Sequence, residues 1–188
     1  MIVSIASGKG GTGKTTIATN LAAVLSDRKV QLLDCDVEAP NSHIFLKPEI
    51  NKTETVNILV PHVDEEKCTL CGRCAEVCQY HAIGVFGKSV LVFPELCHAC
   101  GGCSLACPEN AINKVPHAVG ELQLGRAKGV EFVTGQLNIG EAKATPVISA
   151  VKSNIRNSRI TIIDAPPGTS CPVVETVRGS EFVLLVTE

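Results

Sequence analysis

Aromatic side chains are scarce in this sequence: they make up only 3% of the 188 residues, and tryptophan is absent. Proteins that bind single-stranded nucleic acid usually stack bases on aromatic rings, so this shortage argues against such a surface. The formal net charge of −2 gives no support to the basic footprint of a nucleic-acid-binding protein either. We therefore expect no nucleic-acid partner.

Long apolar runs are also missing. No stretch of about 18 consecutive apolar residues occurs, so the sequence predicts no membrane-spanning helix. A signal peptide is not expected, because the short apolar segment 2–6 leads directly into a glycine-rich motif. Hydrophobic residues still make up 45% of the chain, enough for a packed core. These features favour a cytoplasmic protein.

The glycine-rich motif reads Gly-Lys-Gly-Gly-Thr-Gly-Lys-Thr-Thr over 8–16 and satisfies the P-loop pattern G-x-x-x-x-G-K-[ST]. Glycines let backbone N–H groups point at a phosphate, and the start of the following helix adds positive potential. Lys14 is predicted to reach the β- and γ-phosphates, and Thr15 to bind Mg²⁺. The residues expected to hold the nucleotide phosphates are Gly8, Gly10, Gly11, Thr12, Gly13, Lys14, Thr15 and Thr16.

Two later apolar segments end in carboxylates. Segment 30–34 leads into Asp34-Cys35-Asp36, and segment 159–164 ends at Asp164. Carboxylates at the carboxyl ends of parallel strands face the crevice where ligands bind. Both segments are therefore predicted to be buried parallel strands that bring acidic groups to the phosphate site.

The stretch 9–16 resembles the deviant P-loop of the MinD/ParA and nitrogenase-iron-protein class of ATPases. This resemblance implies a homodimer with nucleotides at its interface, in which Lys9 reaches the phosphates of the partner's nucleotide. It also implies that Asp36 positions the attacking water and that Asp164 holds Mg²⁺ through water. In Asp-Ala-Pro-Pro-Gly-Thr-Ser, which begins at Asp164, Gly168 corresponds to the residue that senses the γ-phosphate.

Cysteines are abundant, and eight of the ten form a tandem repeat. The pattern C-x₂-C-x₂-C-x₃-C occurs twice, 29 residues apart, and Ala82-Ile83 recurs as Ala111-Ile112 with the same offset. This is the spacing of a bacterial ferredoxin with two [4Fe-4S] clusters, in which each fourth cysteine ligates the other cluster. One predicted ligand set is Cys68, Cys71, Cys74 and Cys107; the other is Cys97, Cys100, Cys103 and Cys78.

Zinc is the alternative occupant of these cysteines, but zinc prefers isolated four-ligand groups such as two C-x₂-C pairs. The stretch departs from the ferredoxin pattern in one place: Cys107 precedes Pro108, whereas Cys78 precedes Gln79. The resemblance to the nitrogenase iron protein implies a further option, since a cysteine there, at a similar offset after the strand equivalent to the one that ends at Asp164, binds a cluster shared by two subunits. Here that cysteine is Cys171, and Cys35 is the second thiol available. A buried or mildly acidic thiol is the simpler role for Cys171.

These observations predict a mostly parallel α/β P-loop sheet with helices on both faces, interrupted after its second strand. The expected domains are a discontinuous ATPase domain, 1–62 and 116–188, and an inserted ferredoxin-like α+β domain, 63–115. Short strands are expected at 122–124 and 130–133, and a helix is expected with Thr145 as its N-cap. The C-terminal part of the ATPase fold is not found, because the sequence ends soon after a predicted strand over 182–187.

The sequence therefore predicts an ATPase that uses ATP, Mg²⁺ and two [4Fe-4S] clusters. In the first hypothesis, nucleotide state controls electron transfer to an unidentified redox protein. In the second, the protein resembles the Mrp/Nbp ATPases, which carry or assemble iron–sulfur clusters, and its partner is an apo iron–sulfur client. A positioning ATPase bound to membrane or DNA is disfavoured by the mild acidity and by the lack of a C-terminal amphipathic helix.

Overall fold

The computed structural model describes residues 1–157 and 159–187, which form two compact units. The first unit comprises Met1–Val56, Val119–Asn138 and Lys143–Glu188, and the second comprises Asn57–Ala118 and Ile139–Ala142. The domain expected over 116–188 includes Ser158 and Glu188, which lie outside the described residues. Every helix within the described residues is too short or too polar to cross a membrane.

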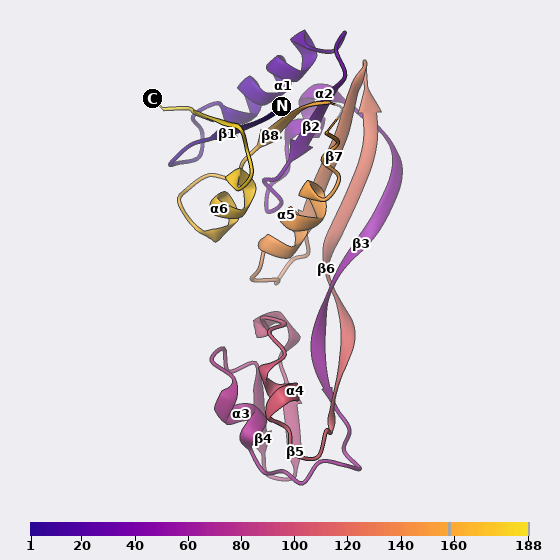
Figure 1. Ribbon diagram of the computed structural model, residues 1–188, viewed down its shortest axis with the longest axis vertical. Coiled ribbons are helices and arrows are strands. Elements are labelled where there is room, and N and C mark those ends of the chain that lie inside the picture. Colours follow the sequence, from indigo (N-terminus) through magenta and orange to yellow (C-terminus); the bar gives the residue numbers. More distant parts are fainter. Residues whose placement is uncertain (158, 188) are drawn as a thin grey trace. The chain divides into compact units, whose positions relative to one another are not determined.

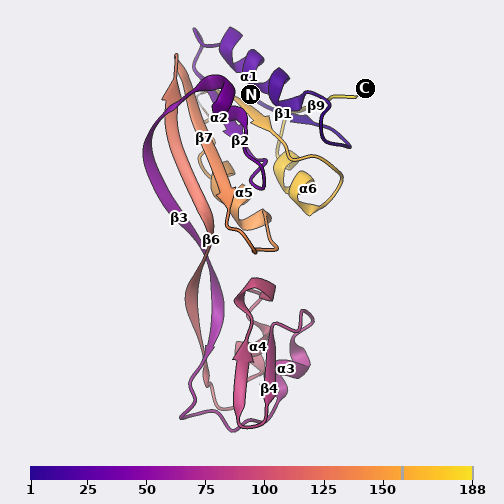
Figure 2. The same ribbon diagram turned by 180° about the vertical axis from the view of Figure 1, so that it is seen from behind.

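A seven-stranded sheet organises the first unit, with strand order β3-β6-β7-β2-β8-β1-β9 (Figures 1 and 2). Neighbouring strands from β7 to β9 run parallel, whereas β6 runs antiparallel to β7. The predicted α/β class with a mostly parallel sheet is confirmed. The strands are β1 Ile2–Ala6, β2 Val30–Asp34, β3 Glu49–Val63, β6 Ile112–Ala127, β7 Val130–Leu137, β8 Ile160–Asp164 and β9 Phe182–Leu185.

The helix α1, Lys14–Val24, covers one face of this sheet and packs through small residues. Ala18 and Ala22 are fully buried against a cluster that includes Leu32 and Phe132. The predicted helix is present, and Leu21 and Leu25 pack against the same cluster, whereas Val24 is 79% exposed. Because alanine is small, the helix axis can lie close to the sheet. The spacing of the larger apolar residues in the sequence does not reveal this close packing.

The opposite face of the sheet is covered by α5, Thr145–Lys152, which contacts α6, Cys171–Val177. Val147, Ile148 and Val151 of α5 are fully buried. A Cβ atom on Gly135 of β7 would lie 2.7 Å from Val147 and 2.8 Å from Val151, so this strand position must be glycine for the helix to pack there. The helix begins one residue before the expected position, since Ala144 is the N-cap and Thr145 is the first helical residue.

Several strands are longer than the sequence predicted. The expected strands 122–124 and 130–133 belong to β6 and β7, which pair from Gly120–Leu137 to Ala127–Val130 across a tight turn. The segment 42–61, which has no clear sequence pattern, contains α2, Ser42–Leu46, and most of β3. These strands alternate polar and small residues, so they lack the continuous apolar run that marks the central parallel strands.

Strand β9 ends the strand order and pairs in parallel with β1, with Val3 opposite Phe182 and Ala6 opposite Leu185. Its four apolar side chains are 45–69% exposed, so it differs from the buried central strands. Strand β9, Phe182–Leu185, is shorter than the strand expected over 182–187.

The second unit contains the two cysteine repeats, and equivalent positions of the two repeats have similar backbone conformations. It contains two five-residue helices, α3 (Arg73–Val77) and α4 (Gly102–Ala106), and a two-stranded antiparallel sheet of β4 (Ile83–Phe86) and β5 (Ser89–Val92). A 3-10 turn, η1, spans Pro94–Leu96. Positive φ angles recur at positions 29 residues apart. The pairs are Leu70 (59°) and Ala99 (52°), Gly72 (80°) and Gly101 (77°), and His81 (51°) and Asn110 (48°).

Candidate phosphate site and cysteine cavity

The glycine-rich motif forms the loop between β1 and α1. Gly13 is the N-cap of α1 with a φ of 92°, a left-handed conformation that favours glycine. The loop therefore presents backbone N–H groups at the start of an 11-residue helix, where an anion binds favourably. The loop residues that line the adjacent pocket are Gly10, Gly11, Gly13, Lys14, Thr15 and Thr16, whereas Gly8 and Thr12 do not line it.

Lys14 lies almost buried at the base of this loop, with 7% of its surface exposed. Its Nζ donates a hydrogen bond to Ser7 Oγ at 2.8 Å, and Ser7 Oγ donates to the carbonyl oxygen of Lys9 at 2.6 Å. The ammonium group is thus held by a single hydroxyl beside the pocket, from which it can turn toward a phosphate. Lys9 is exposed on the outside of the loop.

Three carboxylates meet this loop at the carboxyl ends of β2 and β8. Asp34 Oδ2 accepts a hydrogen bond from the backbone N–H of Ser42 at 3.0 Å, and Ser42 Oγ donates to Asp164 Oδ2 at 3.1 Å. Asp36 lines the pocket itself. Ser42 could not be predicted from the sequence, because a serine at the start of a short helix has many possible partners.

Burial raises the pKa values of all three carboxyl groups. Desolvation, followed by the nearby charge of Asp164, raises the pKa of Asp34 to about 7 and that of Asp36 to about 6. Desolvation also raises the pKa of Asp164, against hydrogen bonds from Thr15 and Ser42 that lower it. A divalent cation would favour the ionised forms.

Several oxygen atoms near the P-loop are suitable ligands for Mg²⁺. Asp164 Oδ1 is buried without a hydrogen-bond partner in the described part of the chain, as are Asn41 Oδ1 and the Thr12 hydroxyl. Oxygen atoms are the ligands that Mg²⁺ prefers. Thr15 lines the pocket and Asp164 lies beside it, and their role as Mg²⁺ ligands stays a prediction.

The remaining predicted residues of this unit lie around the site. Gly168 follows β8 with a φ of 104°, and its N–H donates to the carbonyl oxygen of Ser7 at 3.1 Å. It does not line the pocket, so its contact with a phosphate stays a prediction. Cys35 is fully buried beside Asp34, whereas Cys171 is exposed at the first position of α6.

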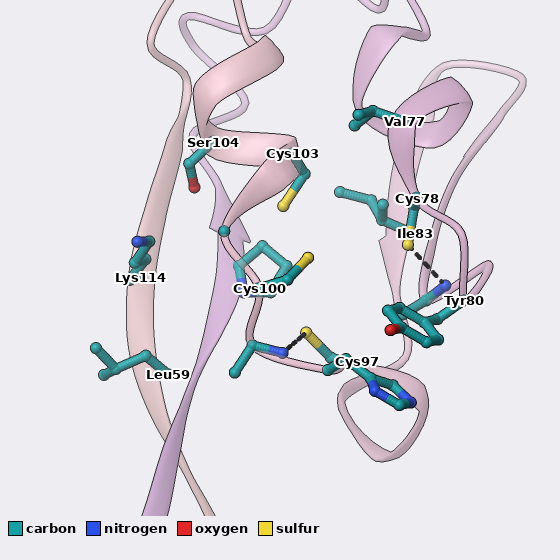
Figure 3. A pocket seen from close by; sticks show the side chains of 15 residues that line it. Leu59, Val77, Cys78, Tyr80, Ile83, Cys97, Cys100, Cys103, Ser104 and Lys114 are labelled. Atoms are coloured by element: carbon teal, nitrogen blue, oxygen red, sulfur yellow. Dashed lines mark hydrogen bonds between the residues drawn. The ribbon is translucent and has the colours of Figure 1, made fainter.

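In the second unit, four cysteines from both repeats line one cavity: Cys78, Cys97, Cys100 and Cys103 (Figure 3). They are the members of one predicted ligand set. The cavity wall is largely apolar and includes Leu59, Val77 and Ile83. Tyr80 and His98 stack beside it with ring centroids 3.4 Å apart, and Lys114 also lines it.

The other set, Cys68, Cys71, Cys74 and Cys107, is more exposed. Cys71 is exposed and the other three are half-buried. Burial raises the pKa of the Cys74 thiol, and the neighbouring Cys68 and Cys103 thiols raise it further. Burial likewise raises the pKa of Cys103, with Cys97 and Cys100 adding to the effect. Cys74 and Cys103, the third cysteines of the two repeats, are therefore neighbours.

Backbone N–H groups donate to three of the cysteine sulfurs. Ala82 donates to Cys78 Sγ at 3.3 Å, Ala111 to Cys107 Sγ at 3.3 Å, and Ala99 to Cys97 Sγ at 3.4 Å. Such hydrogen bonds favour the thiolate that metal ligation needs. Sequence reasoning did not predict these donors, although the repeated Ala-Ile pairs were a signal for two of them.

Thiolate sulfur is a ligand of both zinc and iron–sulfur clusters, so the donor set is chemically compatible with either group. Within residues 1–157 and 159–187, no three Cys, His, Asp or Glu side chains are grouped closely enough to hold one metal ion. A tetrahedral zinc ion would draw four sulfurs into direct contact with one centre, whereas a cubane spreads its four cysteine ligands over four irons. The donor chemistry of Cys78, Cys97, Cys100 and Cys103 fits a cluster, and its presence stays a prediction.

Comparison with known proteins agrees with the geometry of the phosphate site. A family model described as the CobQ/CobB/MinD/ParA nucleotide binding domain matches residues 3–169. The chain is 34% identical over 193 residues to the uncharacterized protein MJ0578 of Methanocaldococcus jannaschii, covering 100% of this chain and 67% of that protein. A shorter match, 55% identical over 42 residues, covers 21% of this chain and 12% of the iron-sulfur cluster carrier protein of Aquifex aeolicus.

Among solved structures, the septum site-determining protein MinD from Pyrococcus horikoshii, complexed with Mg-ADP, aligns with a TM-score of 0.49 at 20% identity. The alignment covers 99% of this chain but only 57% of the MinD chain, so this chain spans little more than half the length of that protein. The family model covers most of the chain, from residue 3 to residue 169. The chain belongs to the CobQ/CobB/MinD/ParA nucleotide-binding domain family.

Proposed function

We propose that this chain is a Mg²⁺-dependent ATPase whose nucleotide state controls electron transfer through two [4Fe-4S] clusters. The observation that carries the proposal is the convergence of Cys78, from the first repeat, with three cysteines of the second repeat on one apolar cavity. The same chain contains a P-loop whose pocket includes Lys14 and Asp36. One polypeptide thus combines a nucleotide site with a candidate redox site.

The chain's own residues would perform the hydrolytic part by positioning and charge neutralisation. Lys14 turns from Ser7 toward the β- and γ-phosphates, and Thr15 and Asp164 hold Mg²⁺. Asp36 aligns the attacking water at the mouth of the pocket. In a homodimer with nucleotides at the interface, Lys9 is exposed and reaches the partner's nucleotide.

The electron-transfer function depends on the cysteine ligands of the second unit. The cysteine ligands are Cys68, Cys71, Cys74 and Cys107 for one cluster, and Cys97, Cys100, Cys103 and Cys78 for the other. When bound, the clusters supply one-electron transfer. Backbone N–H groups such as that of Ala82 stabilise the ligating thiolates, and apolar walls limit solvent access, which are two of the factors that tune cluster potential.

Two features of the chain can connect nucleotide state to the redox unit. Strands β3 and β6 are continuous, and each contributes residues to both compact units. In the first unit, Lys152 of α5 donates hydrogen bonds to the carbonyl oxygens of Glu175 and Arg178, so α5 is tied to the end of α6. A shift of the segment that follows Asp164 would therefore move α5 together with α6.

An electron paramagnetic resonance spectrum of the anaerobically reduced protein, recorded with and without Mg-ATP, tests this proposal. We expect signals from two interacting clusters and a change in potential or transfer rate on nucleotide addition. The Lys14→Ala variant is the matched control, because it should keep both clusters and lose the nucleotide effect. Zinc in place of iron would overturn the redox role, and identical spectra and rates with and without Mg-ATP would overturn the coupling.

A second candidate function is transfer of an iron–sulfur cluster to an apo-protein client, favoured by the short match to a protein named as a cluster carrier. This function predicts that at least one cluster leaves the protein and appears in an apo-ferredoxin acceptor. Full retention of both clusters during that assay favours electron transfer to a redox partner. Either function needs reduced cysteines, and hence a cytoplasmic location.

A further inference from the structure

A second polar cavity lies in the first unit, far from the P-loop. Its wall includes Gln31 of β2, Asn51 of β3, Arg126 of β6, Glu131 of β7 and Arg156. The cavity encloses about 120 Å³, whereas one water occupies about 30 Å³ in the liquid. A small polyatomic ion therefore has room within it.

Three arginines converge on one carboxylate at this cavity. The guanidinium groups of Arg126, Arg156 and Arg159 lie 3.0, 3.5 and 2.8 Å from Glu131 Oε1. Arginine stays protonated in proteins, so the four groups together carry a net charge of +2. Glu131 is the only acidic residue among those that line the cavity in the described part of the chain. Arg159 pairs with Glu131 without lining the cavity, so the lining itself carries a net charge of +1 and the whole cluster a net charge of +2, and an anion would reduce this excess.

The arginines also have more donors than Glu131 can accept. Each guanidinium carries five N–H groups in a planar fork, yet all three share a single carboxylate oxygen. The side chains of Arg126 and Arg156 are 69% and 59% exposed, so their remaining donors are open to a ligand from solvent. Arg159 is 20% exposed, so it fixes Glu131 from the inner side.

Buried amides fix the cavity floor. Gln31 is 1% exposed, its Nε2 donates to the carbonyl oxygen of Asn154 at 2.8 Å, and its Oε1 accepts from the backbone N–H of Arg156 at 3.3 Å. These bonds hold the backbone of Arg156 against β2, so one of the two exposed arginines is anchored. A preorganised donor binds an anion with a smaller entropic cost than a free surface arginine.

The cavity is separate from the nucleotide pocket. Gln31 and Glu131 lie at the amino ends of β2 and β7, whereas Asp34 lies at the carboxyl end of β2, next to the P-loop. Three residues of an extended strand span about 10 Å. An anion held by Arg126 and Arg156 is therefore not one of the phosphates held by the P-loop.

We propose that this cavity binds a phosphate dianion, either free or as the phosphate group of a small phosphomonoester. Arginine forks match the tetrahedral oxygens of phosphate in a bidentate manner, and the charge of the ion balances the excess of +2. The amide of Asn51 supplies a further polar group at the rim of the site. This proposal is independent of the proposed function, since it involves neither the P-loop nor the cysteines.

Isothermal titration calorimetry of the full chain with inorganic phosphate, at low ionic strength, tests the proposal. The double variant Arg126→Gln, Arg156→Gln should weaken binding by a factor on the order of a hundred or more, because two charged donors to the anion are lost. Lys14→Ala, which alters the P-loop, should retain this binding. Arg178→Gln is the matched control, because its side chain is exposed and pairs with Glu175, and neither residue lines the cavity.

Titrations with glycerol 3-phosphate and succinate identify the ligand class. Stronger binding of glycerol 3-phosphate than of inorganic phosphate assigns a phosphomonoester, and the reverse assigns the free ion. Equal or stronger binding of succinate overturns the preference for phosphate, and loss of phosphate binding in Lys14→Ala alone overturns the site. Should the double variant fail to fold, Arg126→Lys keeps the charge but removes the fork, and unchanged phosphate affinity in that variant contradicts the bidentate contact.

Discussion

The backbone N–H of Ala82 donates a hydrogen bond to Cys78 Sγ at 3.3 Å. The same bond, at the same length, joins Ala111 to Cys107 in the second repeat. In both repeats the donor follows the fourth cysteine by four residues. Each fourth cysteine is therefore held by a backbone turn of the same kind. This shared turn explains how Gln79 can replace the proline that follows the other fourth cysteine: the turn depends on the N–H four residues after the cysteine and not on the next residue.

We predict that Cys107→Ser will lose one cluster and retain the other. Two [4Fe-4S] clusters contain about eight irons per chain, so iron analysis of the anaerobic protein should give about four in this variant. Cys171→Ser is the control, because Cys171 is exposed and belongs to neither ligand set. An unchanged iron content in Cys107→Ser, or the same loss in Cys171→Ser, would contradict the assigned ligand sets.

The two clusters should differ in potential because their surroundings differ in charge. Lys114 lines the cavity of Cys97, Cys100 and Cys103, whereas the position 29 residues earlier is Val85. A positive charge favours the reduced cluster, so Lys114→Gln should lower one midpoint potential by an amount on the order of tens of millivolts. Val85→Lys should raise the other potential.

A redox titration followed by electron paramagnetic resonance measures both changes. The prediction requires that each substitution shifts mainly one of the two midpoint potentials. Equal shifts of both clusters in either variant would show that the charge acts on the whole unit instead of one cavity. Iron content must match the wild-type protein in both variants, which separates tuning of a cluster from its loss.

The two lysines of the P-loop should separate nucleotide binding from hydrolysis. Lys14→Ala removes the nearly buried ammonium beside the pocket and should abolish ATP binding. Lys9 is exposed, so Lys9→Ala should leave binding intact and reduce hydrolysis by a factor on the order of 10³, the lower range for a charge supplied from a partner molecule. Nucleotide titration and phosphate release measure the two effects. Wild-type turnover by Lys9→Ala would show that this lysine has no role across a dimer.

The core between α5 and the sheet should govern the stability of the first unit. Ile148 is fully buried, so Ile148→Ala should lower the free energy of unfolding by about 2–5 kcal/mol. Val24 is 79% exposed on α1, so Val24→Ala should change it by no more than about 0.5 kcal/mol. Urea unfolding followed by circular dichroism compares the two variants. A larger loss in Val24→Ala would mean that this end of α1 is covered in solution.

Sequence patterns predicted the central strands because these strands are buried on both faces. Segments 2–6 and 30–34 are strands with those same limits, and 159–164 is one residue longer than β8. The prediction was weaker for β3 and β6, in which exposed polar residues alternate with a few apolar ones. In α1 and its C-cap, the small residues Ala18 and Ala22 are fully buried and Leu21 and Leu25 pack beside them, whereas Val24 is exposed. Hydrophobic periodicity shows that a helix has an apolar side, but not how closely that side approaches a sheet.

By itself, the sequence determined which residue types are present at the required spacing: the glycines, lysines and threonines of the P-loop, the acids after β2 and β8, and the two cysteine repeats. These features depend on local chain geometry, which spacing encodes directly. Only the tertiary structure brought Ser42 to Asp164, and Arg156 and Arg159 to Glu131. Both groupings join residues from distant parts of the chain, and strand order and packing of the helices decide which distant residues meet.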